Sequence, residues 1–460
     1  MISRNQKWTC LILASFAAVS LVAQDGAGQS APGMVADAKI AAALQQISPQ
    51  RIQADIEKLV SFGTRLTLSA QDEKSIAAGH GIGAAREWIK AQFEQYSKEC
   101  GGCLEVKTDS FIEQPMDRIP NATEITNVYA VLKGTDPAQA KRIVLVTGHY
   151  DSRNSDTLDV NGDAPGANDD GSGTVVSLEC ARVLSKLKFP GTIIFLTVAG
   201  EEQGLNGSKH FAKMAKDQGW DLAAVLNDDI VGGDKSAEQD HSVIRVFSEG
   251  VPVAAAEQDI RRIRGLGGES DSASRELARY IAETGRIYDA GVKPMLVFRL
   301  DRYLRGGDHY SFNQQGFAGV RLTEYREDFH HQHQNVRTEN GIEFGDVPKF
   351  VDFDYVAHVA RLNAATLASL AAAPSAPGNV HVVTKELEND TTLTWDATPG
   401  ATAYEVLWRA TTSPEWEHAQ DVGNVTRTTR KVSKDNVIFA VRSVDAAGHS
   451  SLPVVPTPER

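Results

Sequence analysis

Residue types that bind metals recur at five places in the chain, each after an apolar segment or in a glycine-rich turn. The five segments are 148–152, 165–173, 199–208, 226–232 and 306–312. They supply His149, Asp169, Glu201 with Glu202, Asp228 with Asp229, and His309. Imidazole and carboxylate ligands suit zinc, and a site without thiolates leaves the metal Lewis acidic. Each segment alone is compatible with a surface turn, so only the five segments together indicate a metal site.

The pair Glu201 and Glu202 follows the apolar run 192–198, so its backbone emerges from the core and its carboxylates need partners. Neighbouring carboxylates that point in different directions can divide the work, one as a metal ligand and one as a general base. Asp151 stands two residues after His149, where its side chain can orient the imidazole through a hydrogen bond.

The ordered set resembles the zinc exopeptidase family that includes bacterial secreted leucyl aminopeptidases and glutamate carboxypeptidase II, over roughly residues 55–370. The ligands that the resemblance implies are His149, Asp169, Glu202, Asp229 and His309. His149 and Asp229 would bind one zinc, Glu202 and His309 the other, and Asp169 would bridge the two ions. Asp229 is preferred to Asp228 because 229–232 fits the family pattern of aspartate, two residues and glycine.

The resemblance also implies the reaction. A di-zinc peptidase would release N-terminal residues from peptides through a hydroxide held between the metals, with Glu201 as general base and Asp151 as the residue that orients His149. Two zinc ions carry four positive charges, against which three ligand carboxylates and one hydroxide balance.

Three other functions remain open. A carboxypeptidase of the glutamate carboxypeptidase type would need arginines for the substrate's terminal carboxylate, and Arg299, Arg302 and Arg305 precede His309. A glutaminyl cyclase shares the fold but uses one zinc, which the presence of both His149 and Asp169 disfavours. The last alternative is a binding protein without activity on the peptidase fold, which an intact ligand set disfavours.

The segment 323–333 holds three histidines, His330, His331 and His333. Because the five-ligand set is already complete without them, we expect this loop either to line the substrate pocket or to be a plain surface loop.

Helices and strands alternate between residues 38 and 371. Residues 48–60, 83–96 and 174–187 have the apolar spacing of helices, whereas 143–147, 192–198, 223–226 and 295–298 read as buried strands. A helix between the strands 143–147 and 192–198 implies that those strands are parallel. The predicted fold class is α/β, with a mostly parallel central sheet sandwiched by helices.

A second unit follows a linker rich in alanine and proline. We assign 38–372 to the peptidase domain, 373–376 to a flexible linker and 377–460 to a small all-β sandwich. The last unit resembles a fibronectin type III domain, on the basis of Pro377, Trp395, Tyr404 and the alternation at Phe439 and Val441. Such a module would bind a surface or polymer and would not catalyse.

The composition and the N-terminal sequence limit the classes of protein and the cellular locations to be considered. The net charge of −13 over 460 residues excludes a basic nucleic-acid-binding face. Residues 1–23 read as a signal peptide and 24–37 as a flexible lead-in, and no later apolar run is long enough to span a membrane. We therefore expect a secreted or periplasmic protein that acts on peptides.

In such an oxidising compartment Cys100 and Cys103 are expected to form a disulfide, with a redox pair or half of a metal site as alternatives. Cys180 lies in an apolar helical stretch and is expected to be a buried, inert thiol.

Overall fold

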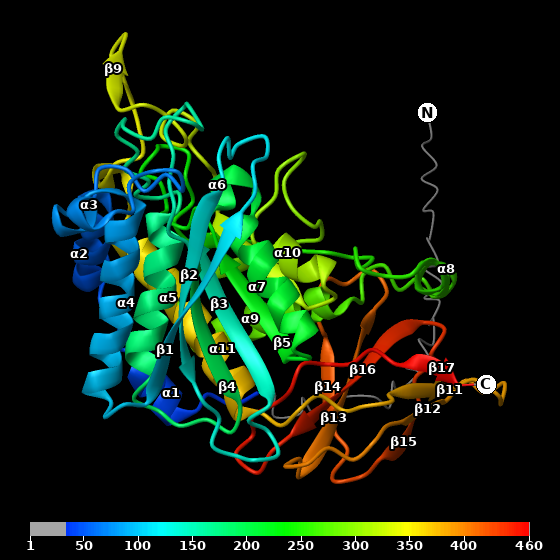
Figure 1. Ribbon diagram of the computed structural model, residues 1–460. Helices are drawn as coiled ribbons and strands as arrows, with labels where there is room; N and C mark the ends of the chain where they lie inside the picture. The colour runs from blue at the N-terminus through cyan, green and yellow to red at the C-terminus, as the bar shows by residue number, and fades with distance from the viewer. Residues whose placement is uncertain (1–33, 460) are drawn as a thin grey trace, which may run out of the picture.

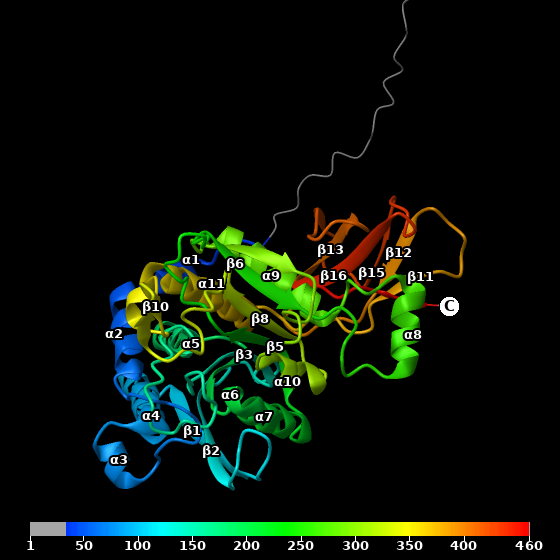
Figure 2. The same ribbon diagram turned by 90° about the horizontal axis from the view of Figure 1, so that it is seen from above.

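The computed structural model describes residues 34–459 and places a large sheet between two layers of helices, with a smaller all-β part beside them (Figure 1). The view from above shows helices on both faces of the sheet (Figure 2). The predicted fold class is confirmed. The predicted signal peptide, residues 1–23, and most of the lead-in lie outside the described residues. In the described part of the chain, no helix is long and apolar enough to cross a membrane.

Eight strands form the large sheet. They are β1 (Leu104–Glu113), β2 (Thr123–Leu132), β3 (Arg142–His149), β4 (Thr192–Val198), β5 (Asp221–Asp228), β6 (Val243–Ser248), β7 (Lys293–Val297) and β8 (Gly319–Glu324). Their order is β1-β2-β4-β3-β5-β8-β6-β7. The central set β4-β3-β5-β8 is parallel throughout, so the carboxyl ends of these four strands share one edge, where ligands bind in sheets of this kind.

The helices cover the two faces of the sheet unequally. One face carries α1 (Ala38–Leu44), α2 (Pro49–Val60), α4 (Gly81–Glu99), α5 (Gly171–Leu184), α9 (Ala273–Ile287) and α11 (Phe353–Ala372). The other carries α7 (Asn206–Asp217) and α10 (His309–Gln314). Short elements complete the domain: α3 (Glu73–Ala77), α6 (Glu201–Gly204), α8 (Glu257–Leu266), η1 (Pro348–Phe350) and the hairpin β9 (Arg337–Glu339) with β10 (Ile342–Phe344).

The alternation of side chains along a strand explains this sandwich. In β3, Val144 and Val146 belong to the larger core under α5 and α11, whereas Leu145 between them packs in the smaller core with Phe211 of α7 and Phe312 of α10. A strand that is apolar on both faces needs helices on both sides, as its continuous apolar sequence indicates.

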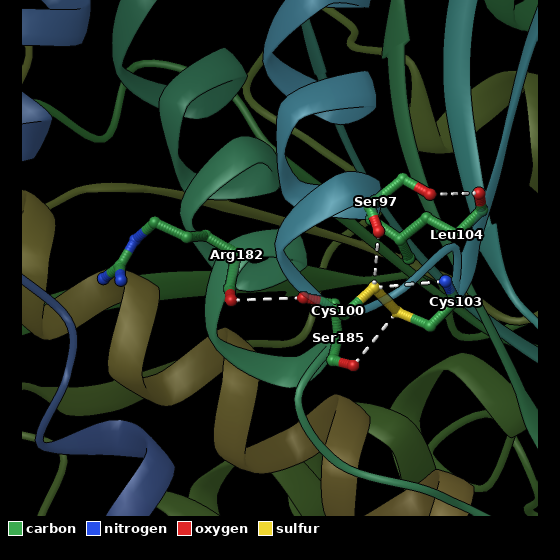
Figure 3. Close-up of a disulfide and its surroundings, with 6 residues drawn as sticks. All are labelled: Ser97, Cys100, Cys103, Leu104, Arg182 and Ser185. Atoms are coloured by element: carbon green, nitrogen blue, oxygen red, sulfur yellow. Dashed lines mark hydrogen bonds between the residues drawn. A yellow bond between two sulfur atoms is a disulfide. The ribbon is translucent and has the colours of Figure 1, made fainter.

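The two cysteines that follow α4 form a disulfide, Cys100–Cys103, just before β1 (Figure 3). The bond fixes the turn between α4 and β1, and the Cys103 Sγ lies 3.1 Å from the backbone oxygen of Ser185. Cys180 is buried and free, as predicted.

The C-terminal part is built of two sheets, β15-β12-β11-β17 and β14-β13-β16. Its strands are β11 (His381–Val383), β12 (Thr391–Thr394), β13 (Ala403–Ala410), β14 (His418–Asp421), β15 (Arg427–Arg430), β16 (Val437–Val444) and β17 (Thr457–Glu459). Trp395, Tyr404, Phe439 and Val441 share its core. These are the residues whose spacing predicts a β-sandwich.

This part is attached to α9 by buried and partly buried polar contacts. Arg442 Nη1 lies 2.8 Å from Glu283 Oε2 of α9, and its Nε lies 2.6 Å from Glu405 Oε2 of β13. The Trp416 indole donates to Glu276 Oε2 at 2.9 Å. Arg409 pairs with Asp271, close to the start of α9.

The segment between the two parts is also held in place. Arg142 of β3 donates to the Ala373 oxygen, and Ser443 donates to the Ser375 oxygen. The segment that the sequence assigns to a flexible linker is therefore hydrogen-bonded to both parts in this structure.

Candidate metal centre

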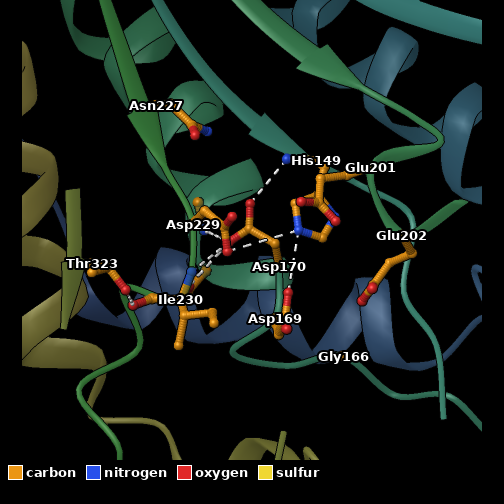
Figure 4. A network of polar contacts seen from close by, with 12 residues as sticks. His149, Gly166, Asp169, Asp170, Glu201, Glu202, Asn227, Asp229, Ile230 and Thr323 are labelled. Carbon is orange, nitrogen blue, oxygen red and sulfur yellow. Dashed lines mark hydrogen bonds and ion pairs between the residues drawn. The ribbon is translucent and has the colours of Figure 1, made fainter. Parts of the chain in front are cut away.

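The carboxyl ends of three parallel strands bring four of the predicted ligands together (Figure 4). His149 is the last residue of β3, Glu202 is in α6 directly after β4, and Asp229 follows β5. Asp169 lies in the turn before α5, which begins at Gly171. Because these strands are parallel neighbours, residues far apart in sequence meet at one edge of the sheet.

The side chains form two clusters that share one residue. In the first, His149 Nε2 lies 3.2 Å from Asp169 Oδ1 and 3.9 Å from Asp229 Oδ1. In the second, His333 Nε2 lies 2.9 Å from Asp169 Oδ2 and 3.0 Å from Glu202 Oε1. Asp169 therefore offers one oxygen to each cluster, and in each cluster the three ligand atoms lie within 4.8 Å of one another.

Other contacts fix the orientation of these side chains. Arg153 Nε lies 2.8 Å from Glu202 Oε2, and Arg153 Nη2 lies 2.5 Å from His333 Nδ1. Arg321 Nη2 lies 3.0 Å from Asp229 Oδ1. Arg153 thus leaves Glu202 Oε1 and His333 Nε2 facing the second cluster. Arg321 instead contacts the same Asp229 oxygen that lies 3.9 Å from His149 Nε2.

Asp151 lies behind His149. The imidazole Nδ1 is 3.1 Å from the Asp151 backbone oxygen and 3.4 Å from its Oδ1. The carboxylate also accepts the backbone N–H groups of Glu201 and Glu202, at 3.3 and 3.2 Å. One side chain thus couples the end of β3 to the start of α6, a position that suits the predicted orienting role.

Glu201 lines the same pocket as the clusters but contributes to neither of them. Burial raises the pKa of its carboxyl well above the usual range, and the neighbouring charges of Asp229 and Glu202 raise it further. A raised pKa makes a carboxylate a stronger proton acceptor, which is the property that a general base needs.

The structure differs from the prediction at His309. Its Nε2 donates to the Leu300 backbone oxygen at 2.9 Å, and the nearest carboxylate, Asp301 Oδ2, is 3.8 Å away. Burial lowers the pKa of His309 to about 4, which leaves the ring neutral. His309 opens α10, whereas His333 follows β8, whose carboxyl end lies at the metal-binding edge. His333 therefore occupies the place that the resemblance gave to His309.

The choice of Asp229 over Asp228 agrees with the geometry. Asp228 accepts a hydrogen bond from Asn363 Nδ2 of α11 at 2.8 Å, so it faces the helix layer on the other side of β5. Successive side chains of an extended chain point in opposite directions, and Asp229 accordingly faces the clusters.

The donor set fits a metal. His149 Nε2 and Glu202 Oε1 are buried and have no hydrogen-bond partner in the described structure, although they lie about 3–4 Å from the other cluster atoms. Buried polar groups rarely stay unsatisfied, and an ion at the centre of each cluster would satisfy them. Histidine with carboxylate oxygens is a donor set that suits zinc.

The comparisons with known proteins agree with this site. The sequence model of Peptidase family M28 matches residues 127–347, which span both clusters. A protein of Leptosphaeria maculans described as a probable zinc metalloprotease is 45% identical over 91% of this chain and 97% of its own length. A probable zinc metalloprotease of Pyrenophora teres is 44% identical over 92% of this chain and 87% of its own. The chain belongs to peptidase family M28.

Solved structures support the same fold for this M28 member. The LapA aminopeptidase of Legionella pneumophila matches with a TM-score of 0.50 at 21% identity, over 73% of this chain and 75% of its own. LapB of the same organism matches with a TM-score of 0.51 at 19% identity, over 74% and 77%. At this identity the likeness concerns the fold alone. The relatives at 44–45% identity make the chain a metallopeptidase, with zinc as the metal that their descriptions name.

The M28 site opens into a pocket of about 590 Å³. Its carboxylates are Asp169, Glu201, Glu202 and Asp229, and its arginines are Arg118, Arg153, Arg302, Arg305 and Arg321. Its apolar side chains are Leu205, Ile230, Leu304 and Phe329. The loop that follows β8 lines this pocket through Phe329 and His333, which agrees with the pocket-lining interpretation of its sequence.

Sequence reasoning missed His333, Arg153 and Arg321. His333 could have been identified from its place after β8, because the ligand-bearing loops of the parallel strands all leave the sheet at the same edge. Arginines that orient ligands carry no local motif, so only the three-dimensional contacts identify them.

Proposed function

We propose that this metallopeptidase binds two zinc ions and removes N-terminal residues from peptides. The observation that carries the proposal is the position of Asp169, with one carboxylate oxygen in each of two ligand clusters and with Glu201 beside them. His149, Asp169 and Asp229 would hold one ion. Asp169, Glu202 and His333 would hold the other.

The metals, when bound, would polarise the scissile carbonyl and lower the pKa of water. The chain's own residues do the rest. Glu201 accepts a proton from the attacking water and returns it to the leaving amine, for which its raised pKa is suited. Asp151 holds His149 and the start of α6 in place, so Glu201 stays in register with the clusters.

The arginines near the pocket bear on the choice of chain end. Of the arginines that a carboxypeptidase would need, Arg299 is outside the pocket lining and donates to the Tyr303 hydroxyl. Arg302 is already bound to Asp301 and Glu327.

One observation favours a carboxypeptidase instead. Arg305 lines the pocket, its side chain is 32% exposed, and its only ion pair among the described residues is with Glu327. A terminal carboxylate of the substrate could therefore reach this guanidinium.

Matched peptides test the two alternatives. The same peptide is supplied free, N-acetylated and C-amidated, and the released residue is identified by mass spectrometry. An aminopeptidase should lose most of its kcat/KM on acetylation and little on amidation. The opposite pattern, with release from the C-terminal end and a further loss in Arg305→Gln, would establish the carboxypeptidase.

Two features outside the site belong to the same proposal. We infer that the chain is exported, from its N-terminal sequence and from a disulfide that suits an oxidising compartment. We also infer that residues 377–460 form a fibronectin type III-like domain that binds a surface or polymer, because their two small sheets enclose Trp395 and Tyr404. Edman sequencing of the protein recovered from culture medium would test the first inference.

A further inference from the structure

A second, much smaller cavity lies behind the cluster that contains His333. Its volume is about 10 Å³, which is room for a single water-sized particle. Six carboxylates line it: Asp169, Asp234, Glu324, Glu327, Asp328 and Asp346. Asn168, Ile230, His331 and Gln332 complete the wall.

Two buried oxygens on this wall have no partner. Glu324 is fully buried, and its Oε2 accepts from Asn168 Nδ2 at 3.1 Å and from the Asp234 backbone N–H at 2.9 Å, which leaves Oε1 unpaired. Gln332 is 8% exposed, and its Nε2 donates to Asp169 Oδ2 at 2.8 Å, so its unpaired amide atom is the oxygen. Unpaired buried oxygens of this kind call for a ligand.

Three residues on the same wall form a cluster of possible metal ligands. Asp234, Asp328 and His331 each offer one ligand atom, and the three atoms lie within 4.8 Å of one another. His331 Nδ1 lies 2.5 Å from Asp234 Oδ2, and its ring stacks on Phe350 at 3.6 Å between centroids, which fixes it in place.

The charges on the wall are unbalanced. Glu327 is neutralised by Arg245, Arg302 and Arg305. Asp346 accepts the backbone N–H groups of Asn168 and Asp169. The cationic partners of Asp234, Glu324 and Asp328 among the described salt bridges are only the imidazoles of His331 and His330.

A water molecule would not balance the charge of this wall. Water donates two hydrogens, which could serve the unpaired oxygens of Glu324 and Gln332 but would leave the carboxylates of Asp234 and Asp328 with imidazoles as their only cationic partners among the described residues. Amide hydrogens of Asn168 and Gln332 already bond Glu324 and Asp169, and His331 bonds Asp234. A cation would satisfy the two unpaired oxygens and balance the carboxylate charge as well.

We propose that this cavity binds a third divalent cation, separate from the two-zinc centre. Its ligands are the carboxylates of Asp234, Glu324 and Asp328 and the amide oxygen of Gln332. Carboxylate and amide oxygens select a hard cation of the Ca²⁺ or Mn²⁺ class. The ion ties the loop that carries His333 to the end of β8, through Glu324 on the strand and Asp328 and Gln332 on the loop.

The test uses the full chain loaded with zinc. CaCl₂ or MnCl₂ is titrated into protein in metal-free buffer by calorimetry, and bound elements are counted after desalting. We expect one equivalent of Ca²⁺ or Mn²⁺ per chain beyond the zinc, and a higher Tm in its presence. Asp328→Asn and Glu324→Gln should each weaken binding of that ion at least about tenfold, because each removes a charged ligand.

The control variant is Asp217→Asn, an exposed carboxylate that pairs with Lys213 on the surface and should bind the ion as the wild type does. Asp328 is partly exposed, so Asp328→Asn should fold even if Glu324→Gln does not. The proposal fails if neither ion binds the zinc-loaded wild type, if both variants bind as tightly, or if the additional ion is zinc alone. The zinc content measured in the same experiment tests the two-zinc centre independently, so a negative result for the third cation would not count against the zinc sites.

Discussion

Nε2 of His333 lies 2.9 Å from Oδ2 of Asp169, although one residue stands in a loop after the last central strand and the other in the turn before α5. The contact joins two segments that are far apart in the sequence. It also decides which histidine completes the second cluster.

His333→Ala should lose about one zinc per chain and most of its peptidase activity, because the second cluster then keeps only two carboxylate ligands. The matched variant His309→Gln should keep both ions, because His309 binds a backbone oxygen and no cluster. Zinc is measured by elemental analysis beside kcat/KM. Loss of zinc in His309→Gln with full zinc in His333→Ala would restore the assignment made from sequence.

Glu201→Gln should keep its zinc and its fold but lose activity, because the amide cannot accept a proton. General acid–base catalysis contributes about 10²–10⁴-fold, so kcat should fall by at least that range. Glu202→Gln should instead lose metal from the second cluster. Full activity in Glu201→Gln would rule out Glu201 as the general base. Loss of zinc in Glu201→Gln, with zinc retained in Glu202→Gln, would show that Glu201 is the metal ligand and Glu202 the base.

Zinc binding should release protons at neutral pH. Burial alone would lower the pKa of His333, but the carboxylates of Glu202 and Asp169 raise it to about 10 in the metal-free protein. The ring is therefore protonated at pH 7 and must lose its proton to bind zinc, so apparent affinity should rise with pH until about 10.

Calorimetric titration of the metal-free protein in buffers of different protonation enthalpy measures this release. His333→Gln should release about one proton fewer than the wild type. His309→Gln should match the wild type, because the pKa of His309 is about 4 and its ring carries no proton to lose at pH 7. Equal release by all three proteins would contradict the assignment.

The C-terminal part should stabilise the peptidase domain. Arg442→Met removes the ion pair with Glu283 of α9, leaves Glu405 buried without its partner, and should lower the free energy of unfolding by about 3–5 kcal/mol. The control Lys213→Met breaks an exposed pair with Asp217 and should cost about 1 kcal/mol or less. Urea unfolding measures both.

Deletion of residues 375–460 would expose the polar face of α9 that binds Arg409, Trp416 and Arg442, and should give a protein that is less stable or insoluble. A truncated chain as stable as the full one would show that the two parts are independent, as a flexible linker would allow.

Much of the fold follows from local patterns. The apolar runs at 143–147 and 192–198 with a helical segment between them imply parallel strands, and β3, α5 and β4 have that arrangement. Period-two and period-3.6 patterns depend on a residue's near neighbours, so a single sequence carries them.

The site was predictable where a ligand directly follows a recognisable strand. His149, Glu202 and Asp229 stand within a few residues of apolar runs, and Asp169 stands in a glycine-rich turn at a helix start. The sequence by itself therefore identified four candidate ligands, a candidate general base beside them and the edge of the sheet where they meet.

Only the tertiary structure decided between His309 and His333, and only it found Arg153, Arg321 and the contacts of α9 with the C-terminal part. The path of a long loop after a strand depends on how the loop packs against segments that are distant in the sequence. The ring of His331, for example, stacks on Phe350. Sequence separation carries no information about such contacts, because they are stabilised by burial and charge pairing that exist only once the chain has folded.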